Sequence, residues 1–341
     1  MAAPGIDQHN LQIYLRKMID TVQGEVDFTR ITQGNSNLTY IVRDEAGNRW
    51  VMRRPPIGQV AATAHNMERE HRVIAALDGH VPVPKALFFC DDESVSGAPF
   101  FMMDFVDGMS PASEKDAERD FSPHQRRAAS ENLVDTLAQI HEVDVDKVGL
   151  GDLGRREDYV SRQLHRWRKQ WDVNKIRDIP EVDHTFDILT RRIPMQQGAA
   201  LVHGDYKFDN VLFDTTGEVL AVVDWELCTL GDPIADLAAL VMLWTEPGES
   251  NALGQKTATS APGMLTRSEI VDRYRLRSSR SIDELDYYLA FTNWRVACVT
   301  ESVYSRLKKN MMGDHPATDP EVFGDAAQHH ASLALELASA L

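Results

Sequence analysis

Two short polar motifs carry the residue types that phosphoryl transfer requires. In the first, which spans 203–210, Asp205 lies two residues after a histidine and Asn210 lies five residues further on. In the second, Asp224 directly follows the apolar run 220–223. Phosphoryl transfer uses a loop aspartate to orient the attacking hydroxyl, and an asparagine and a distant aspartate to hold magnesium. The spacing therefore predicts Asp205 as the catalytic carboxylate and Asn210 and Asp224 as Mg2+ ligands.

The composition describes a globular chain with an acidic surface. The sequence has 341 residues, of which 43% are hydrophobic and 26% charged, and its formal net charge is -16. Such a field repels phosphate backbones, so we expect no nucleic-acid partner. Three cysteines lie far apart without CxxC spacing, which disfavours a zinc site or disulfides. We see neither a signal-peptide core nor an apolar run long enough for a membrane, and expect a cytoplasmic protein.

The order of secondary structure predicts two unlike halves. Alternating apolar residues predict strands, and the helical period marks one helix among them, over 63–77. The expected strands are 28–31, 38–42, 50–53, 82–89 and 99–106. After residue 108 the pattern is helical, with helices starting near 122, 158, 266 and 281. The predicted fold class is α+β: a small antiparallel β-sheet lobe at 1–106 and a mainly helical lobe at 107–341.

Several segments together resemble a known family. They are 40–42, 51–56, 68–70, 203–210, 224–226, 231–237 and 303–306. With these segments the chain resembles the aminoglycoside phosphotransferase and choline kinase-like family. It is most similar to the kinase-like domain fused in front of some long acyl-CoA dehydrogenases. The resemblance runs from about residue 25 to about residue 310. It implies a protein-kinase-like two-lobed fold and transfer of the γ-phosphoryl group of ATP, with Mg2+, to a hydroxyl group.

The resemblance also implies how ATP is held. Arg53 stands at the third-strand position where most kinases have lysine, and it would pair with Glu70, with Glu68 as the second choice. Arg54 is the competing cation. An arginine retains charge and binds phosphate with a forked geometry. The substitution also leaves open a non-catalytic, kinase-like nucleotide-binding module.

Backbone groups and one lysine complete the expected nucleotide site. Lys207 is expected to contact the transferred phosphoryl group, and its alternative is a solvated lysine. Two segments would hold the nucleotide: a phosphate-covering turn and a hinge beside adenine. Their alternatives are an ordinary hairpin turn and a plain linker. The residues are Gly34, Asn35 and Ser36 in the turn, and Asp104 and Val106 in the hinge.

Other polar residues near the motifs are expected to be structural. His203 ends a strand and would stabilise the loop through hydrogen bonds. Asp232 precedes a proline, which is typical of a helix N-cap. Asp236 would tie the following helix to the catalytic loop.

The sequence says less about the acceptor. Arg162, Arg166 and Lys169 share one helix face, which could meet an anionic substrate such as a coenzyme A ester, although a solvated face is the favoured interpretation. The resemblance implies a hydroxyacyl-CoA-like acceptor and, as partner, an acyl-CoA dehydrogenase on a separate chain. The wider family allows an aminoglycoside, an amino alcohol or a sugar. A further alternative is a metal-dependent hydrolase that uses the aspartates at 205, 209, 214 and 224.

Overall fold

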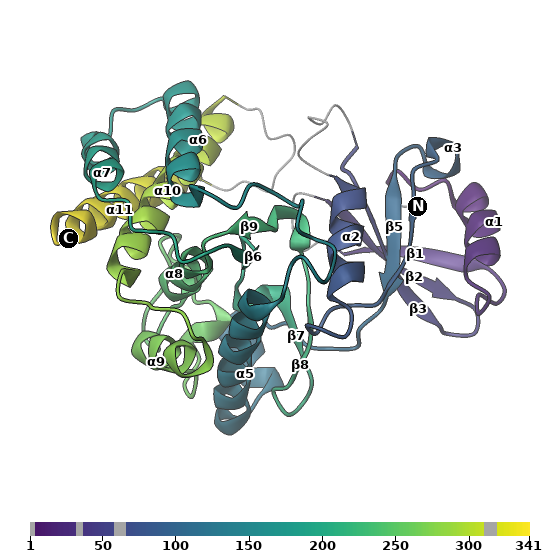
Figure 1. Cartoon of the computed structure of the whole chain (residues 1–341). Coiled ribbons are helices and arrows are strands. Elements are labelled where there is room, and N and C mark those ends of the chain that lie inside the picture. The colour runs from purple at the N-terminus through teal and green to yellow at the C-terminus, as the bar shows by residue number, and fades with distance from the viewer. Residues whose placement is uncertain (1–3, 32–36, 58–65, 310–318) are drawn as a thin grey trace.

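The N-terminal part is an antiparallel sheet in the order β1-β2-β3-β5-β4 (Figure 1). The computed structural model describes residues 4–31, 37–57, 66–309 and 319–341. The sheet strands are β1 (Val26–Ile31), β2 (Leu38–Asp44), β3 (Arg49–Arg54), β4 (Ala86–Cys90) and β5 (Phe100–Asp104). Three helices accompany the sheet: α1 (Gln8–Met18), α2 (Met67–Leu77) and α3 (Glu93–Ser96).

Strand alternation gives this sheet two buried faces. Met52 and Met102 pack with α1 in one hydrophobic cluster, whereas Val51 and Met103 belong to the main core together with α2. Successive side chains of a strand point to opposite faces, so neighbouring residues are sorted to different cores. Figure 1 shows α1 and α2 on opposite sides of the sheet. Arg53, two residues after Val51, therefore faces α2.

The rest of the chain is mainly helical, as the sequence predicts. Its helices are α4 (Glu114–Asp120), α5 (Pro123–Glu142), α6 (Tyr159–Asn174), α7 (Pro180–Arg191), α8 (Pro233–Leu243), α9 (Arg267–Arg277), α10 (Leu285–Lys308) and α11 (Pro320–Ser339). Two short hairpin-like sheets lie among them. They pair β6 (Ala200–Val202) with β9 (Thr229–Gly231), and β7 (Val211–Phe213) with β8 (Val219–Val222). The two polar motifs lie at the ends of these strands.

The α+β fold class is confirmed, and the helix bounds differ from the sequence prediction at specific places. The expected helix start at Ser281 is wrong, because α10 begins at Leu285. The Ser281 hydroxyl instead donates to the Asp283 carboxylate at 2.6 Å, a local bond that competes with a helix cap. The helix expected over 63–77 begins at Met67, and 63–65 lie outside the described residues. Helices α3, α4, α7 and α11 were not predicted from the sequence.

Two arginines of α2 fasten that helix to the helical part. The Arg69 guanidinium donates to the carbonyls of Leu153 and Cys228, each at 2.8 Å. One turn later, Arg72 pairs with Asp152. These bonds fix the helix that carries Glu70 relative to the loop that carries the second motif. Within the described ranges, no helix combines the length and apolar character needed to cross a membrane.

Asp232 caps α8, the helix that supports the loop of the first motif. Its side chain accepts from the Ile234 N–H at 3.1 Å and from the buried Tyr288 hydroxyl at 2.6 Å. We predict that Asp232→Ala lowers the unfolding free energy by about 2 to 3 kcal/mol, because it removes a cap and leaves a buried hydroxyl unpaired. Urea unfolding of the purified variant measures the loss.

Asp319 provides a matched control for this prediction. It also caps a helix and also precedes a proline, and its side chain accepts from the Glu321 N–H at 3.0 Å. Asp319 is exposed, so Asp319→Ala should cost about 1 kcal/mol or less. Equal losses in the two variants would contradict the assigned role of the Tyr288 contact.

Candidate functional site

A buried carboxylate accepts hydrogen bonds from the start of the loop that carries Asp205. Asp236, on the first turn of α8, accepts from the His203 N–H at 2.6 Å and from the Gly204 N–H at 3.0 Å. Gly204 has φ +86, and a Cβ there would lie 2.8 Å from the Leu227 carbonyl oxygen. Only glycine adopts this backbone conformation so close to another chain segment. The expected tie between Asp236 and the catalytic loop is present.

His203 is fully buried and belongs to the scaffold. Its Nδ1 accepts from the Asp205 N–H at 3.3 Å, and its Nε2 lies 3.0 Å from the Val223 carbonyl oxygen. The second contact requires a proton on Nε2, so the neutral ring satisfies both bonds. The Trp225 ring lies against it, with centroids 4.7 Å apart. The histidine thus joins the two motifs without reaching solvent.

Asp205, Lys207 and Asn210 converge within the first motif. The Asn210 amide nitrogen donates to the Asp205 carbonyl at 2.8 Å and to its Oδ2 at 3.1 Å. Lys207 Nζ lies 3.2 Å from the same carboxylate and 3.6 Å from Asp209. Burial lowers the pKa of Lys207, but the carboxylates of Asp205, Asp209 and Asp224 together raise it by more, so the net pKa is raised. The ammonium group therefore stays charged beside a carboxylate that is about one-third exposed.

Asp224 lies close to Asn210 because the two motifs are bonded through their backbones. The Val223 N–H donates to the Asn210 carbonyl at 3.0 Å. Asp224 itself has φ 67 and ψ 56, a left-handed conformation that a non-glycine residue rarely adopts. Such strain concentrates at functional sites. Since the Asn210 amide nitrogen is bonded to Asp205, its oxygen is the atom able to join Asp224 around a cation.

Arg53 connects the sheet and α2 to the second motif. Its guanidinium lies 2.8 Å from Asp224, 3.3 Å from Glu70 and 4.0 Å from Glu226. Burial lowers the pKa of Arg53, but the Glu70 and Asp224 carboxylates raise it by more. Burial raises the pKa of Glu70 to about 7, against the opposing effect of Arg53. Both side chains are almost fully buried.

The structure separates the two candidate arginines. Arg54 points to the other side of the strand, where its guanidinium donates to the Ser96 carbonyl at 2.9 Å. Arg53, and not Arg54, lies beside Glu70 and Asp224. Glu68, the second choice as partner, is exposed on α2.

Of the two segments expected to hold the nucleotide, the structure describes the hinge but not the turn. Gly34, Asn35 and Ser36 lie outside the described residues. The next residue, Asn37, donates to the Glu226 carboxylate at 2.7 Å. The sequence analysis did not predict this contact. The one signal in the sequence was that Asn37 follows the expected turn and Glu226 lies two residues after Asp224.

Two backbone groups of the expected hinge already form hydrogen bonds within the protein. The Asp104 N–H donates to the Lys85 carbonyl at 2.9 Å, and the Val106 carbonyl accepts from the Gly108 N–H at 3.0 Å. Adenine held at this segment would therefore bind other backbone groups of it.

A cavity of about 720 Å³ adjoins the first motif. Lys207, Phe208 and Asp209 line one side of it. Its other walls come from α8, α10, α11 and residues 250–259. They include a group of aliphatic side chains, namely Leu240, Val241, Leu243, Leu289, Leu333 and Leu337. The sequence analysis did not predict this cavity, because α11, which forms part of its wall, was not predicted.

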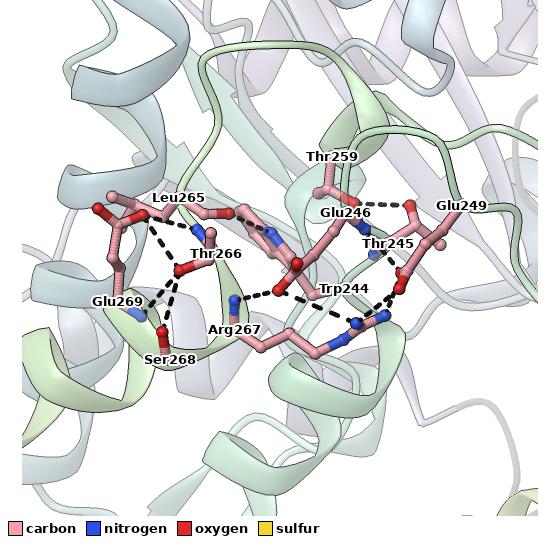
Figure 2. A network of polar contacts seen from close by, with 10 residues as sticks. All are labelled: Trp244, Thr245, Glu246, Glu249, Thr259, Leu265, Thr266, Arg267, Ser268 and Glu269. Carbon is pink, nitrogen blue, oxygen red and sulfur yellow. Dashed lines mark hydrogen bonds and ion pairs between the residues drawn. The ribbon is translucent and has the colours of Figure 1, made fainter.

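One wall of this cavity is braced by a polar network (Figure 2). The Arg267 N–H donates to Glu246 at 2.8 Å, and its guanidinium pairs with Glu249. The Trp244 indole N–H donates to the Leu265 carbonyl at 2.8 Å. The Thr245 N–H donates to the Thr259 hydroxyl oxygen at 3.0 Å. These bonds hold the loop after α8 in a defined shape, which is consistent with a rigid pocket wall.

The aspartate cluster of the hydrolase alternative is not assembled around one point. Asp214 accepts from the Thr216 N–H at 2.7 Å and from the Glu218 N–H at 2.9 Å. These bonds close the turn between β7 and β8. Across the described part of the chain, no three His, Cys, Asp or Glu side chains are grouped so as to hold a metal.

Comparison with known proteins gives consistent matches. Residues 27–270 match the phosphotransferase enzyme family. Acyl-CoA dehydrogenase family member 10 of Mus musculus is 33% identical over 340 residues, which are 98% of this chain and 31% of that protein. The chain spans less than half the length of the curated relatives it matches.

Two solved structures show the same fold. A Ralstonia eutropha protein, provisionally described as an aminoglycoside phosphotransferase, superposes with a TM-score of 0.83 at 31% identity. That match covers 98% of this chain and 99% of the other. The aminoglycoside phosphotransferase APH(4)-Ia, solved with AMP-PNP and hygromycin B, has a TM-score of 0.60 at 15% identity. It covers 97% of this chain and 100% of the other.

The raised pKa of Glu70 predicts a pH dependence of stability. The folded protein protonates Glu70 up to about pH 7, whereas the ordinary pKa is 4.5. Between these values the folded state holds a proton that the unfolded chain has lost, so this contribution to stability declines as pH rises. We expect wild type to lose about 1 kcal/mol or more relative to Glu70→Gln between pH 5 and pH 7.5, since one pKa unit corresponds to about 1.4 kcal/mol.

Urea unfolding at the two pH values, without nucleotide or metal, tests this. The exposed Glu68 on the same helix supplies the control, because Glu68→Gln should shift stability equally at both pH values. If the stability of wild type relative to Glu70→Gln stays constant or rises between the two pH values, the buried carboxyl is not neutral.

Proposed function

The chain belongs to the phosphotransferase enzyme family, and we propose that it transfers the γ-phosphoryl group of ATP to a hydroxyl group of a hydroxyacyl-CoA-like acceptor. It is a small-molecule phosphotransferase that acts on hydroxyl groups. The observation that carries the finer proposal is the meeting of Asp205 and Asn210 at one loop, with Asp224 bonded to Arg53 at its side.

In the proposed reaction, Asp205 orients the acceptor hydroxyl and takes its proton. The acceptor oxygen forms a bond to the γ-phosphorus as the bond to the bridging oxygen of ADP breaks. Lys207, 3.2 Å from Asp205, neutralises charge on the transferred group. Placing charged groups in position before the reaction is the main source of catalysis for this chemistry.

Asn210 and Asp224 are the proposed Mg2+ ligands. Magnesium prefers hard oxygen ligands and retains waters, so one amide oxygen, one carboxylate and ATP phosphates form a suitable donor set. Arg53, held by Glu70, is the proposed contact to the phosphates. We propose further that adenine binds at the hinge 104–106 and that the turn 34–36 covers the phosphates. The fold relative solved with AMP-PNP is consistent with an ATP-like donor.

The cavity beside Lys207 favours an acyl acceptor over an aminoglycoside. Its aliphatic wall suits a hydrocarbon chain. Asp209 is the one carboxylate among the described residues that line it, whereas Lys207 and Arg267 are cations. A polycationic aminoglycoside requires several carboxylates, which this wall does not supply. The names of the curated relatives also point to acyl-CoA chemistry, and we propose an acyl-CoA dehydrogenase as functional partner.

We also propose that the chain divides near residue 106 into an ATP-binding lobe and a lobe that binds metal and acceptor. The last sheet strand ends at Asp104, and the next helix begins at Glu114. The segment between them crosses from one part to the other.

Replacing the reacting carboxylate tests the proposed chemistry. Asp205→Asn should lower kcat by about 10²- to 10⁴-fold while Mg-ATP still binds, because the hydroxyl loses its proton acceptor. Asp224→Asn should instead weaken Mg-dependent ATP binding. ADP release is followed with a panel of hydroxyacyl-CoA thioesters, aminoglycosides and amino alcohols, and ATP binding by calorimetry.

Asp214→Asn is the matched control, since Asp214 caps a turn and should leave both readouts within about twofold of wild type. If the intact protein binds Mg-ATP but releases ADP with none of the acceptors, the non-catalytic nucleotide-binding module is the better account. Turnover of phosphoesters without ATP would support the hydrolase.

The acceptor pocket is tested by removing apolar volume. Leu333→Ala should lower kcat/KM for the preferred acyl acceptor by about tenfold, because burying a side chain of this size contributes about 1.5 kcal/mol or more. KM for ATP should not change. Leu276, which is 83% exposed, gives the control Leu276→Ala. Equal effects on ATP and acceptor would mean that the cavity does not hold the acceptor.

A further inference from the structure

A second groove, of about 700 Å³, lies between α6 and α10. Arg166 and Lys169 of α6 line it from one side, and Arg306 of α10 lines it from the other. All three cations are exposed. They are brought together because residues three and four apart lie on one helix face and α6 packs against α10.

These cations are left without acidic partners, unlike their neighbour on the same helix. Arg168 lies on another face of α6 and pairs with Asp172 at 3.1 Å and with Asp183 at 2.6 Å. By contrast, Arg166, Lys169 and Arg306 make no ion pair with a carboxylate of the described ranges, and no described Asp or Glu lines the groove. In a chain of net charge -16, three cations gathered without carboxylates create a local positive field that attracts anions.

Apolar surface lies beside these charges. Trp167 and Val299 line the same groove, and so does Val173, which is 74% exposed. A tryptophan ring supplies a stacking surface for a planar base. Arginine and lysine side chains supply donors for phosphate oxygens. The groove therefore combines the two kinds of contact that a nucleotide uses.

We propose that this groove binds a small nucleotide-like anion. Arg166, Lys169 and Arg306 contact its phosphate groups, and Trp167 with Val173 packs against its base. The volume is in the range of small-molecule sites. The overall negative charge of the chain disfavours a nucleic acid or an anionic membrane, whose charge extends well beyond the groove. The phosphates come either from a free nucleotide or from the nucleotide part of a coenzyme A ester.

The inference concerns binding and does not depend on the proposed reaction. Binding of coenzyme A, adenosine 3′,5′-bisphosphate and pantetheine is measured by calorimetry with the full chain. Saturating Mg-AMP-PNP blocks the proposed ATP site. The test variant combines Arg166→Gln, Lys169→Gln and Arg306→Gln. Its control removes the same charge from exposed cations elsewhere, Lys17→Gln, Arg43→Gln and Lys115→Gln.

We expect coenzyme A or the bisphosphate to bind the test variant at least tenfold more weakly than wild type, with the control within about twofold. Wild-type affinity should fall steeply with salt, and the test variant should lose most of this salt dependence. Pantetheine, which lacks phosphates, should show no difference between variants. Tighter binding of coenzyme A than of the bisphosphate assigns the groove to the ester, and equal affinity assigns it to a free nucleotide.

The proposal would be overturned if coenzyme A and the bisphosphate bound the test and control variants with equally reduced affinity, because such a loss would reflect the change in net charge alone. The same conclusion would follow if the wild type bound neither nucleotide, or if it bound phosphatidylserine vesicles or duplex DNA more tightly than both. Circular dichroism spectra of the two variants establish that they are folded before the affinities are compared.

Discussion

The geometry of the site depends on the pairing of one buried cation. Arg53 extends from β3 to Glu70 on α2 at 3.3 Å and to Asp224 after β8 at 2.8 Å. A buried guanidinium destabilises the protein strongly if a partner is removed. Its two partners come from different elements, so the charge is satisfied only when the sheet, α2 and the second motif are assembled together. The same side chain therefore joins the two parts of the fold and defines the proposed nucleotide site.

A second buried charge positions the catalytic loop independently of the sheet. Burial raises the pKa of Asp236, but His141, His203 and the Gly204 N–H together lower it by more, and the pKa is below its ordinary value. The carboxylate is therefore ionised at neutral pH, and it accepts both N–H groups at the start of the catalytic loop. Because α8 supplies this carboxylate, the position of Asp205 is set by the helical part of the protein. The position of Asp224 depends in addition on its ion pair with Arg53 of the sheet.

The sequence allows a prediction of those parts of the site that are local. Asp205 and Asn210 are five residues apart, so their spacing alone places them in one loop, and the separate strand before Asp224 is visible as an apolar run. Contacts between distant residues were not accessible: Asn37 and Glu226 are 189 residues apart in sequence. The cavity beside Lys207 was missed for the same reason, because α11 completes its wall and shows no motif. At Ser281 a local side-chain bond prevailed over the expected helix start.

The charge balance around Arg53 favours binding of the proposed donor together with a metal. Glu70, Asp224 and Glu226 surround this single guanidinium, so the cluster is negative when all three carboxylates are ionised. Burial raises the pKa of Glu70 to about 7, and the neighbouring carboxylates add to the rise. Metal-free ATP would bring more negative charge to the same place and be repelled. The proposed Mg2+ at Asn210 and Asp224 would offset this repulsion. Because the cation would also neutralise part of the Asp224 charge, the Arg53 guanidinium would attract the phosphates more strongly.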